Sequence, residues 1–234
     1  MRSPRARETS CIGGMKNLAD ALLYGIADLG YIDPERLEST VAQMLEGGVD
    51  VLQLRAKGFD ESSIESFARR IVPLSEAAGV PLILNDHPEL VPSVGAQGAH
   101  VGQDDLDVAD ARWRAGRALN NEVPPTWIGK STHSCEQALG AVAEGADYIG
   151  FGPLFATPTK PGRPAIGLDW VGRVHEEVRI PIFCIGGIKR ENLARILDAG
   201  ARRIVVVSGI LQAEDIAAYC RDVRSELVRR FKTT

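Results

Sequence analysis

The sequence predicts an α/β fold, a single (β/α)₈ TIM barrel, on three observations. Short apolar runs and longer amphipathic stretches alternate eight times along the 234 residues. Most of the short runs are apolar throughout, which is typical of parallel strands buried on both faces. The length also suits one such barrel, which takes about 250 residues. A doubly wound open sheet is the alternative, but it rarely contains eight regular units without a nucleotide-binding fingerprint.

The individual elements follow in order along the chain. The predicted strands are residues 22–26, 51–54, 81–84, 98–101, 126–129, 148–151, 182–185 and 204–207. One predicted helix begins at Asp33-Pro34, and the others span residues 60–78, 88–94, 107–118, 134–144, 168–178, 189–199 and 213–231. Asp33 is a favoured capping residue, Pro34 suits the first helical position, and Asp60 caps the second helix.

A weak internal repeat supports this reading of the chain. Gly48, Gly145 and Gly200 each stand between a predicted helix and the strand that follows it. Glycine is favoured there because the residue after a helix often adopts a left-handed backbone conformation. We therefore assign residues 21–234 to one catalytic barrel domain. Residues 1–20 are expected to be an N-terminal extension, poorly ordered or a short helix.

The composition excludes several classes of protein. The chain has 27 basic and 31 acidic residues, a net charge of −4, which argues against a large basic surface for nucleic acid. No apolar run approaches the roughly 18 residues that a membrane span needs. The arginines near the N-terminus are not followed by the apolar segment of a secretory signal. The four cysteines are far apart and predict neither a zinc site nor a disulfide framework. We expect a cytoplasmic protein without nucleic-acid or membrane partners.

Functional residues are expected where strands end, because the active sites of these barrels form there. Gln53, Arg55 and Lys57 lie at the end of the second predicted strand. Side chains alternate along an extended segment, so these three share one face. Two cations and an amide suit a phosphate or a pyrophosphate. A solvated basic loop is the alternative interpretation.

Carboxylates follow the next two predicted strands. Asn85 and Asp86 come after the third strand, and Asp104 and Asp105 come after the fourth. Two carboxylates at neighbouring strand ends predict a Mg²⁺ site completed by substrate phosphate and water. The alternative is a solvated or helix-capping role, which is favoured for Asp107.

Groups that bind anions follow the fifth and sixth predicted strands. Ser131 and His133 stand just before a predicted helix, where hydroxyls and free backbone N–H groups suit an anion. His133 is compatible with an acid–base role or with simple packing or capping. The loop of residues 152–162 is long enough to close over bound phosphates. It contains Thr157, Thr159 and Lys160.

The last two strand ends predict a phosphate monoester site. Gly186 and Gly187 follow the seventh strand, and Val207 and Ser208 follow the eighth. These two loops usually bind phosphate in such barrels, and glycine lets backbone N–H groups approach the anion. The sequence contains no Ser-His-Asp, dinucleotide-binding or Walker-type pattern. The residues alone therefore predict metal-assisted transfer or cleavage at a phosphorylated small molecule.

Seven short motifs thus occur in order, each at the end of a predicted strand. They are Gln53-x-Arg55-x-Lys57, Asn85-Asp86, Gly102-Gln103-Asp104-Asp105, Ser131-Thr132-His133, Thr157-Pro158-Thr159-Lys160, Ile185-Gly186-Gly187-Ile188 and Val207-Ser208. Each motif is weak alone, but together they are specific. In this order they resemble the thiamine-phosphate synthase family, over about residues 22–227.

The resemblance implies a reaction and a division of the site. The family joins 4-amino-2-methyl-5-hydroxymethylpyrimidine diphosphate to 4-methyl-5-(2-hydroxyethyl)thiazole phosphate, in some members its carboxylated form, and releases thiamine phosphate and pyrophosphate. The residues implied to hold the pyrimidine diphosphate are Gln53, Arg55, Lys57, Asn85, Ser131 and Lys160. Those implied to hold the thiazole phosphate are Thr157, Thr159, Gly187, Val207 and Ser208. The implied ligands of the Mg²⁺ cofactor are Asp86 and Asp105, and the implied catalytic set is Lys57, Lys160, Ser131 and Arg55.

The family's mechanism is dissociative and needs no protein nucleophile. The aminopyrimidine stabilises a methylene cation, which the thiazole nitrogen captures. Mg²⁺ and the basic side chains would stabilise the leaving pyrophosphate, and the barrel would position the thiazole. Two positions depart from the family: Ala56 replaces a frequent acidic residue, and His87 replaces a frequent arginine.

Two rival functions are compatible with the resemblance. A thiazole tautomerase relative shares the barrel and a histidine corresponding to His133, but it would not need the Mg²⁺ and pyrophosphate set. A non-catalytic regulator would only bind a thiamine precursor. Asp86, Asp105 and Lys57, together with residues 157–160, favour the synthase. The expected partners are phosphorylated small molecules, and a homo-oligomer is compatible with the sequence.

Overall fold

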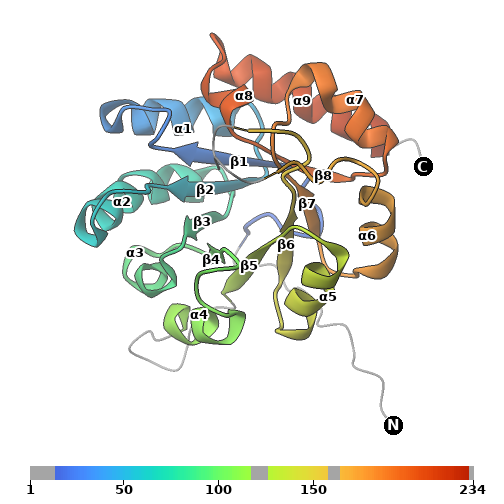
Figure 1. Cartoon of the computed structure of the whole chain (residues 1–234). Coiled ribbons are helices and arrows are strands. Elements are labelled where there is room, and N and C mark those ends of the chain that lie inside the picture. Colours follow the sequence, from blue (N-terminus) through green and yellow to red (C-terminus); the bar gives the residue numbers. More distant parts are fainter. Residues whose placement is uncertain (1–13, 117–125, 158–163, 232–234) are drawn as a thin grey trace.

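The chain folds into one closed barrel of eight parallel strands surrounded by helices (Figure 1), as a computed structural model shows for residues 14–116, 126–157 and 164–231. The strands pair in chain order, from β1 to β8, and β8 pairs with β1. They are β1 (Leu23–Asp28), β2 (Val51–Arg55), β3 (Leu82–Asn85), β4 (Gly98–Val101), β5 (Trp127–Thr132), β6 (Tyr148–Phe151), β7 (Ile182–Cys184) and β8 (Arg203–Val206). The predicted (β/α)₈ barrel is confirmed.

The helices lie between consecutive strands or follow the last one, and they cover the outside of the barrel (Figure 1). They are η1 (Pro34–Arg36), α1 (Leu37–Glu46), α2 (Glu61–Ala77), η2 (Pro88–Leu90), α3 (Val91–Val94), α4 (Val108–Ala115), α5 (Cys135–Ala143), α6 (Val171–Glu177), α7 (Arg190–Asp198), α8 (Ser208–Leu211) and α9 (Ile216–Phe231). The predicted helices are all present. One difference is α8, a short helix where the sequence predicted only a loop, and it comes directly after β8.

The local signals in the sequence have the expected physical basis. The Asp60 side chain accepts a hydrogen bond from the Ser63 N–H at 2.8 Å and so caps α2. Gly48, Gly145 and Gly200 all have left-handed backbone, with φ of 88°, 89° and 103°. A side chain would strain that conformation, so glycine allows the chain to leave each helix and enter the next strand.

The barrel has a second core inside the ring of strands. Alternate strand residues point inward and pack with one another, and the buried members are Tyr24, Ile26, Val51, Ile83, Trp127, Tyr148, Phe183 and Val205. Leu18 and Ala21, which precede β1, are each 1% exposed and belong to the same cluster. They close the inner core at the end where the strands begin.

The N-terminal segment is therefore partly integrated into the barrel. Lys16 forms an ion pair with the buried Asp50 at 2.9 Å, and Leu18 is in the inner core. Residues 1–13 lie outside the described part of the chain, so the N-terminal extension predicted for residues 1–20 stays a prediction. Among the described helices, none combines the length and the apolar composition needed to cross a bilayer.

Candidate functional site

A cavity opens where the strands end, at the carboxyl side of the barrel. Its lining includes residues of all eight strands or of the segments that follow them. About 80 Å³ is open to the centres of water molecules, several times the volume that one water needs. The predicted site residues that line it are Gln53, Arg55, Asn85, Ser131, Thr157, Gly187, Val207 and Ser208. Residues far apart in the sequence thus meet around one space.

Arg55 enters this cavity from the last position of β2 and is held there by a buried carboxylate. Its guanidinium donates to Asp28 Oδ2 at 2.7 Å, and the two side chains are 14% and 1% exposed. Asp28 ends β1 directly opposite Arg55. Its other oxygen accepts a hydrogen bond from the Gly30 N–H at 3.0 Å. The ion pair fixes the direction in which Arg55 offers its remaining N–H groups.

Sequence reasoning missed Asp28. The first strand was predicted to end at residue 26, but β1 continues to Asp28. A carboxylate two residues beyond the predicted strand end was the signal that would have found it.

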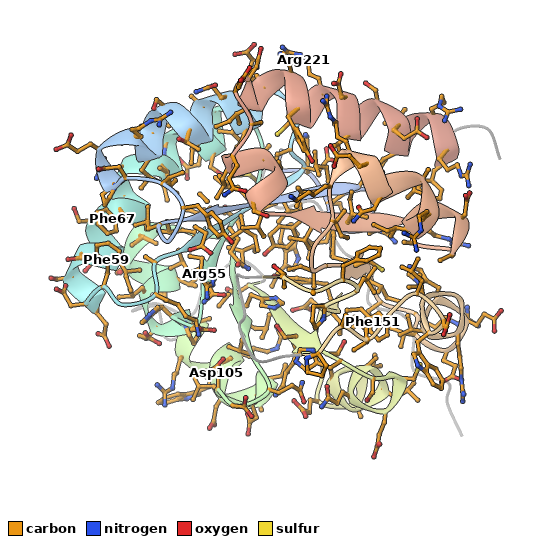
Figure 2. All side chains as sticks on the ribbon, turned by 45° about the horizontal axis from the view of Figure 1, so that its top comes forward. Arg55, Phe59, Phe67, Asp105, Phe151 and Arg221 are labelled. Carbon is orange, nitrogen blue, oxygen red and sulfur yellow. The ribbon has the colours of Figure 1, made fainter. Side chains whose placement is uncertain are left out.

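Lys57, Asp86 and Asp105 lie beside the cavity rather than in its lining. Lys57 Nζ is 3.0 Å from Asp86 Oδ2, and the side chains are 55% and 21% exposed. The Asp86 N–H donates to the His100 carbonyl at 2.8 Å, which ties Asp86 to the end of β4. Asp105 Oδ2 accepts from the Gly102 N–H at 2.8 Å. Figure 2 shows Asp105 below Arg55, and β3 lies between β2, which Arg55 ends, and β4, which Asp105 follows.

Asp86 has an unusual backbone. Its φ is 64°, and it is the one non-glycine residue with positive φ in the described part of the chain. Aspartate tolerates this conformation better than most residues, but it still costs free energy. Such strain is concentrated at functional sites, where the structure holds a side chain in a required place. By contrast, Asp107 only caps α4, accepting from the Asp110 N–H at 2.7 Å, as the alternative interpretation held.

Ser131 and His133 stand at the end of β5. Ser131 Oγ is 3.0 Å from His100 Nε2, and the Ser131 carbonyl accepts from Gln103 Nε2 at 2.6 Å. His133 Nδ1 contacts the Gly152 carbonyl. A carbonyl only accepts hydrogen bonds, so His133 carries its proton on Nδ1 in this contact.

The loop after β6 is described only up to Thr157. Thr157 lines the cavity, whereas Thr159 and Lys160 lie outside the described residues, so their placement stays a prediction. The described part of this loop is bound to the loop after β7. The Leu154 N–H donates to the Ile185 carbonyl at 2.8 Å, and the Phe155 N–H donates to the Gly186 carbonyl at 3.0 Å.

Glycine is required in the loop after β7 for reasons of packing. Gly186 and Gly187 have φ of 100° and 66°. A Cβ on Gly187 would lie 2.7 Å from the Phe155 Cβ, which is too close for real side chains. Gly187 borders the cavity together with Val207 and Ser208, which begin the turn into α8.

Other cavity residues that sequence reasoning missed come from inside the barrel. Tyr24, His100, Tyr148 and Phe183 line the deep part of the cavity. Burial raises the pKa of the Tyr148 phenol well above its usual value of 10.0, so it stays protonated. For Tyr24, His100 and Tyr148, the signal in the sequence was a polar residue at an inward-facing position of a strand.

His87 is tied to a neighbouring carboxylate. Its Nδ1 is 2.9 Å from Glu89 Oε1, and this hydrogen bond is the main cause that raises the pKa of His87 above 6.5. Glu61 lies near the same pair. The position that the resemblance would fill with arginine is thus occupied by a histidine held toward Glu89.

Comparison with known proteins agrees with this arrangement. The family model described as thiamine monophosphate synthase matches residues 23–210. A thiamine-phosphate synthase of Thermus thermophilus is 44% identical over 196 residues, which cover 82% of this chain and 90% of that protein. One from Chloroflexus aurantiacus is 40% identical over 210 residues, which cover 89% of this chain and 94% of that protein.

Solved structures are similar as well. The thiamine phosphate pyrophosphorylase from Pyrococcus furiosus matches with a TM-score of 0.78 and 28% identity, over 90% of this chain and 97% of that one. A geranylgeranylglyceryl phosphate synthase from Thermoplasma acidophilum, solved with sn-glycerol-1-phosphate, matches with a TM-score of 0.67 and 16% identity, over 93% of this chain and 96% of that one. At that identity the second match shows the fold alone.

Proposed function

Since the chain belongs to the thiamine monophosphate synthase family, we propose that the cavity at the barrel mouth joins an aminopyrimidine diphosphate to a thiazole phosphate. The chain is a thiamine-phosphate synthase, a transferase of thiamine biosynthesis. The products are thiamine phosphate and pyrophosphate. The observation that carries the proposed site is the meeting of residues from both predicted subsites around one cavity.

The leaving pyrophosphate is the main charge that this site has to stabilise. The bond between the pyrimidine methylene carbon and the diphosphate oxygen breaks, and its electron pair leaves with the pyrophosphate. Arg55 is fixed at the cavity by Asp28, and Lys57 stands beside it. Cations that are already in place stabilise developing negative charge without having to reorganise. Lys160, outside the described residues, is proposed to join them from the loop after β6.

We propose that Asp86 and Asp105 hold a Mg²⁺ ion through their carboxylates. Each uses one oxygen in a described contact, Asp86 with Lys57 and Asp105 with the Gly102 N–H. Within the described residues, the other oxygen of each accepts no hydrogen bond, and such hard oxygen donors are what Mg²⁺ prefers. When bound with the diphosphate, the ion would neutralise charge on the leaving group. Strain at Asp86 is consistent with a carboxylate held for this purpose.

The second half of the reaction is positional. The electron-rich aminopyrimidine stabilises the methylene cation, and the thiazole nitrogen forms the new C–N bond. This step needs no protein nucleophile and no proton transfer. The segments at Gly187 and Ser208 border the cavity. We assign them to the thiazole phosphate, so that binding brings the thiazole nitrogen near the cation.

His133 separates this function from a tautomerase. A tautomerase would use His133 to move a proton, so His133→Ala would lower its rate by about 10²-fold or more. In the synthase, we assign His133 a structural role, because its Nδ1 contacts the Gly152 carbonyl. We therefore expect a much milder effect of His133→Ala on thiamine phosphate formation.

The test measures thiamine phosphate formed from both substrates, with and without a chelator. Turnover should stop with the chelator and return when Mg²⁺ is added. Asp86→Asn should remove most activity, because a neutral amide is a poorer ligand. Asp107→Asn is the matched control, since asparagine caps a helix as well as aspartate does. Turnover that is insensitive to the chelator, or a His133→Ala variant that loses more activity than Asp86→Asn, would contradict the proposal.

Three further parts of the proposal concern the setting of the enzyme. The partners are the two phosphorylated small molecules, in line with the family. A cytoplasmic location and self-association into a homo-oligomer stay predictions from the sequence.

A further inference from the structure

Five polar side chains form one continuous chain of hydrogen bonds inside the barrel. Gln53 Nε2 donates to the Tyr24 hydroxyl at 2.8 Å, which is 3.1 Å from the Tyr148 hydroxyl. The Tyr148 hydroxyl is 3.2 Å from His100 Nδ1, and His100 Nε2 is 3.0 Å from Ser131 Oγ. The five residues come from five different strands, and all of them line the cavity.

The protein makes room for this chain. A Cβ on Gly129 would lie 2.1 Å from the Tyr148 ring, so only glycine allows that ring to lie there. The ring of Phe183 packs edge-on against both tyrosines, at centroid distances of 5.3 and 5.7 Å. The two tyrosine rings are thus buried and held by packing against Phe183.

The chain of hydrogen bonds runs in one direction, which follows from the amide of Gln53 at its start. An amide nitrogen only donates, so the Tyr24 oxygen accepts from Gln53 and its own hydrogen must go to Tyr148. Burial raises the pKa of Tyr24 and Tyr148 far above 10.0, so both keep their hydrogens. Tyr148 in turn donates to His100 Nδ1. Among the described protein groups, the reverse direction would leave the Tyr24 hydrogen without an acceptor at a position only 2% exposed, which is costly.

The direction of the hydrogen bonds fixes the tautomer of His100 and the role of the Ser131 hydroxyl. His100 Nδ1 accepts, so the neutral ring carries its hydrogen on Nε2. That hydrogen is donated to Ser131 Oγ. Ser131 therefore accepts from His100, and its own hydroxyl hydrogen is free to point into the cavity. The Ser131 backbone is held as well, because its carbonyl accepts from Gln103 Nε2 at 2.6 Å.

We propose that His100 is a positioning residue, which sets the Ser131 hydroxyl as a hydrogen-bond donor into the cavity through the chain that begins at Gln53. The group that receives this hydrogen bond is an acceptor of the bound substrate, a diphosphate oxygen or a ring nitrogen. The identity of that substrate rests on the proposed function. The order of hydrogen bonds within the protein does not depend on it.

The first experiment measures the tautomer of His100 without any ligand. The chain has four histidines, so ¹⁵N-histidine labelling gives a simple NMR spectrum, and loss of one signal set in His100→Gln assigns His100. The ¹⁵N shifts should show hydrogen on Nε2 and none on Nδ1. Gln53→Glu places an acceptor at the start of the chain, so it should reverse every bond and move the hydrogen to Nδ1.

Two tyrosine variants give the matched comparison. Tyr148→Phe removes the donor to Nδ1 but keeps the ring, so the fold should survive and the preference for one tautomer should be lost. Tyr219→Phe also removes a phenol hydroxyl, but in α9 outside the barrel, and should leave His100 unchanged. Hydrogen on Nδ1 in the wild type, or an unchanged tautomer in Tyr148→Phe, would overturn the proposal.

The second experiment measures steady-state kinetics with the two substrates. Tyr148→Phe and Ser131→Ala should each raise the KM for the pyrimidine diphosphate roughly tenfold, the effect of one hydrogen bond. The KM for the thiazole phosphate should change little. The double variant should be no worse than Ser131→Ala, because both changes remove the same bond. Additive effects would overturn the positioning role. Absence of turnover in the wild type would instead overturn the proposed function and leave the tautomer result standing.

Discussion

Replacing Asp28 with asparagine should weaken both the fold and the activity through Arg55. The substitution keeps the size of the side chain and the acceptor for the Gly30 N–H. It removes the charge that faces the Arg55 guanidinium at 2.7 Å. A hydrogen bond to a charged group is worth about 1.5–3 kcal/mol. Arg55 is 14% exposed at the cavity and can still reach water, so the larger penalty of a fully buried unpaired charge does not apply.

The expected magnitudes follow from these contacts. For a domain of this size, about 1.5–3 kcal/mol corresponds to a fall in Tm of roughly 3–12 °C. A guanidinium that loses its fixed direction costs activity as well, because a displacement of about 1 Å costs up to about 10²-fold. We expect kcat/KM for the pyrimidine diphosphate to fall roughly 10- to 100-fold.

A double-mutant cycle checks the cause. Asp28→Asn is measured alone and in an Arg55→Gln background. Asp33→Asn is the control, because Asp33 is an exposed capping aspartate that asparagine can replace. Unfolding in urea and thiamine phosphate formation are the two readouts. The effects of Asp28→Asn should largely disappear in the Arg55→Gln background. If Asp28→Asn had its full effect without Arg55, the ion pair would not be the reason, and our account of this part of the site would be wrong.

Three further predictions follow from single contacts. Lys57→Ala should lower kcat by about 10²-fold with an unchanged Tm, because this lysine is 55% exposed and supports charge rather than packing; an unchanged kcat would remove Lys57 from the site. Gly187→Ala should destabilise the protein by roughly 1–3 kcal/mol, because φ is 66° and its Cβ would clash with Phe155. Gly140→Ala, where nothing lies within 4 Å, should stabilise α5 by up to about 1 kcal/mol, and equal Tm shifts for the two would contradict the reasoning. Burial lowers the pKa of His175 below 6.5, so the unfolded chain binds a proton more readily and stability is lost as the pH falls below 6.5. His175→Leu should therefore weaken the pH dependence of the free energy of unfolding in urea over this range. An identical pH dependence in the variant would show that His175 does not cause it.

The fold could be predicted from the sequence because each helix and strand has a local cause. Apolar runs marked every strand, and Asp60 and Gly200 marked where a helix begins and where one ends. The strand-end rule then gathered Gln53, Arg55 and Ser208 at one cavity, although they are far apart in the chain. These predictions required only the alternation of side chains and the direction of the strands.

Residues that depend on partners across the barrel were not accessible in this way. His100 is one polar residue in a four-residue strand, and its role depends on Tyr148 and Ser131 in two other strands. Asp28 was missed because the end of the first strand was predicted two residues too early. Its role also depends on its ion pair with Arg55 on the next strand. Register between strands sets both contacts, and register is a property of the closed barrel.

Closure of the inner core at Leu18 and Ala21 has a kinetic consequence. The cavity ends in packed aromatic rings, those of Tyr148 and Phe183, which are both 0% exposed. Substrates and products therefore share a single passage at the carboxyl side. A molecule seated against Tyr24 and His100 has to enter before any molecule seated above it, and it leaves last. Such a site imposes an order of addition and release, so the product that leaves last should be a competitive inhibitor only toward the substrate that enters first.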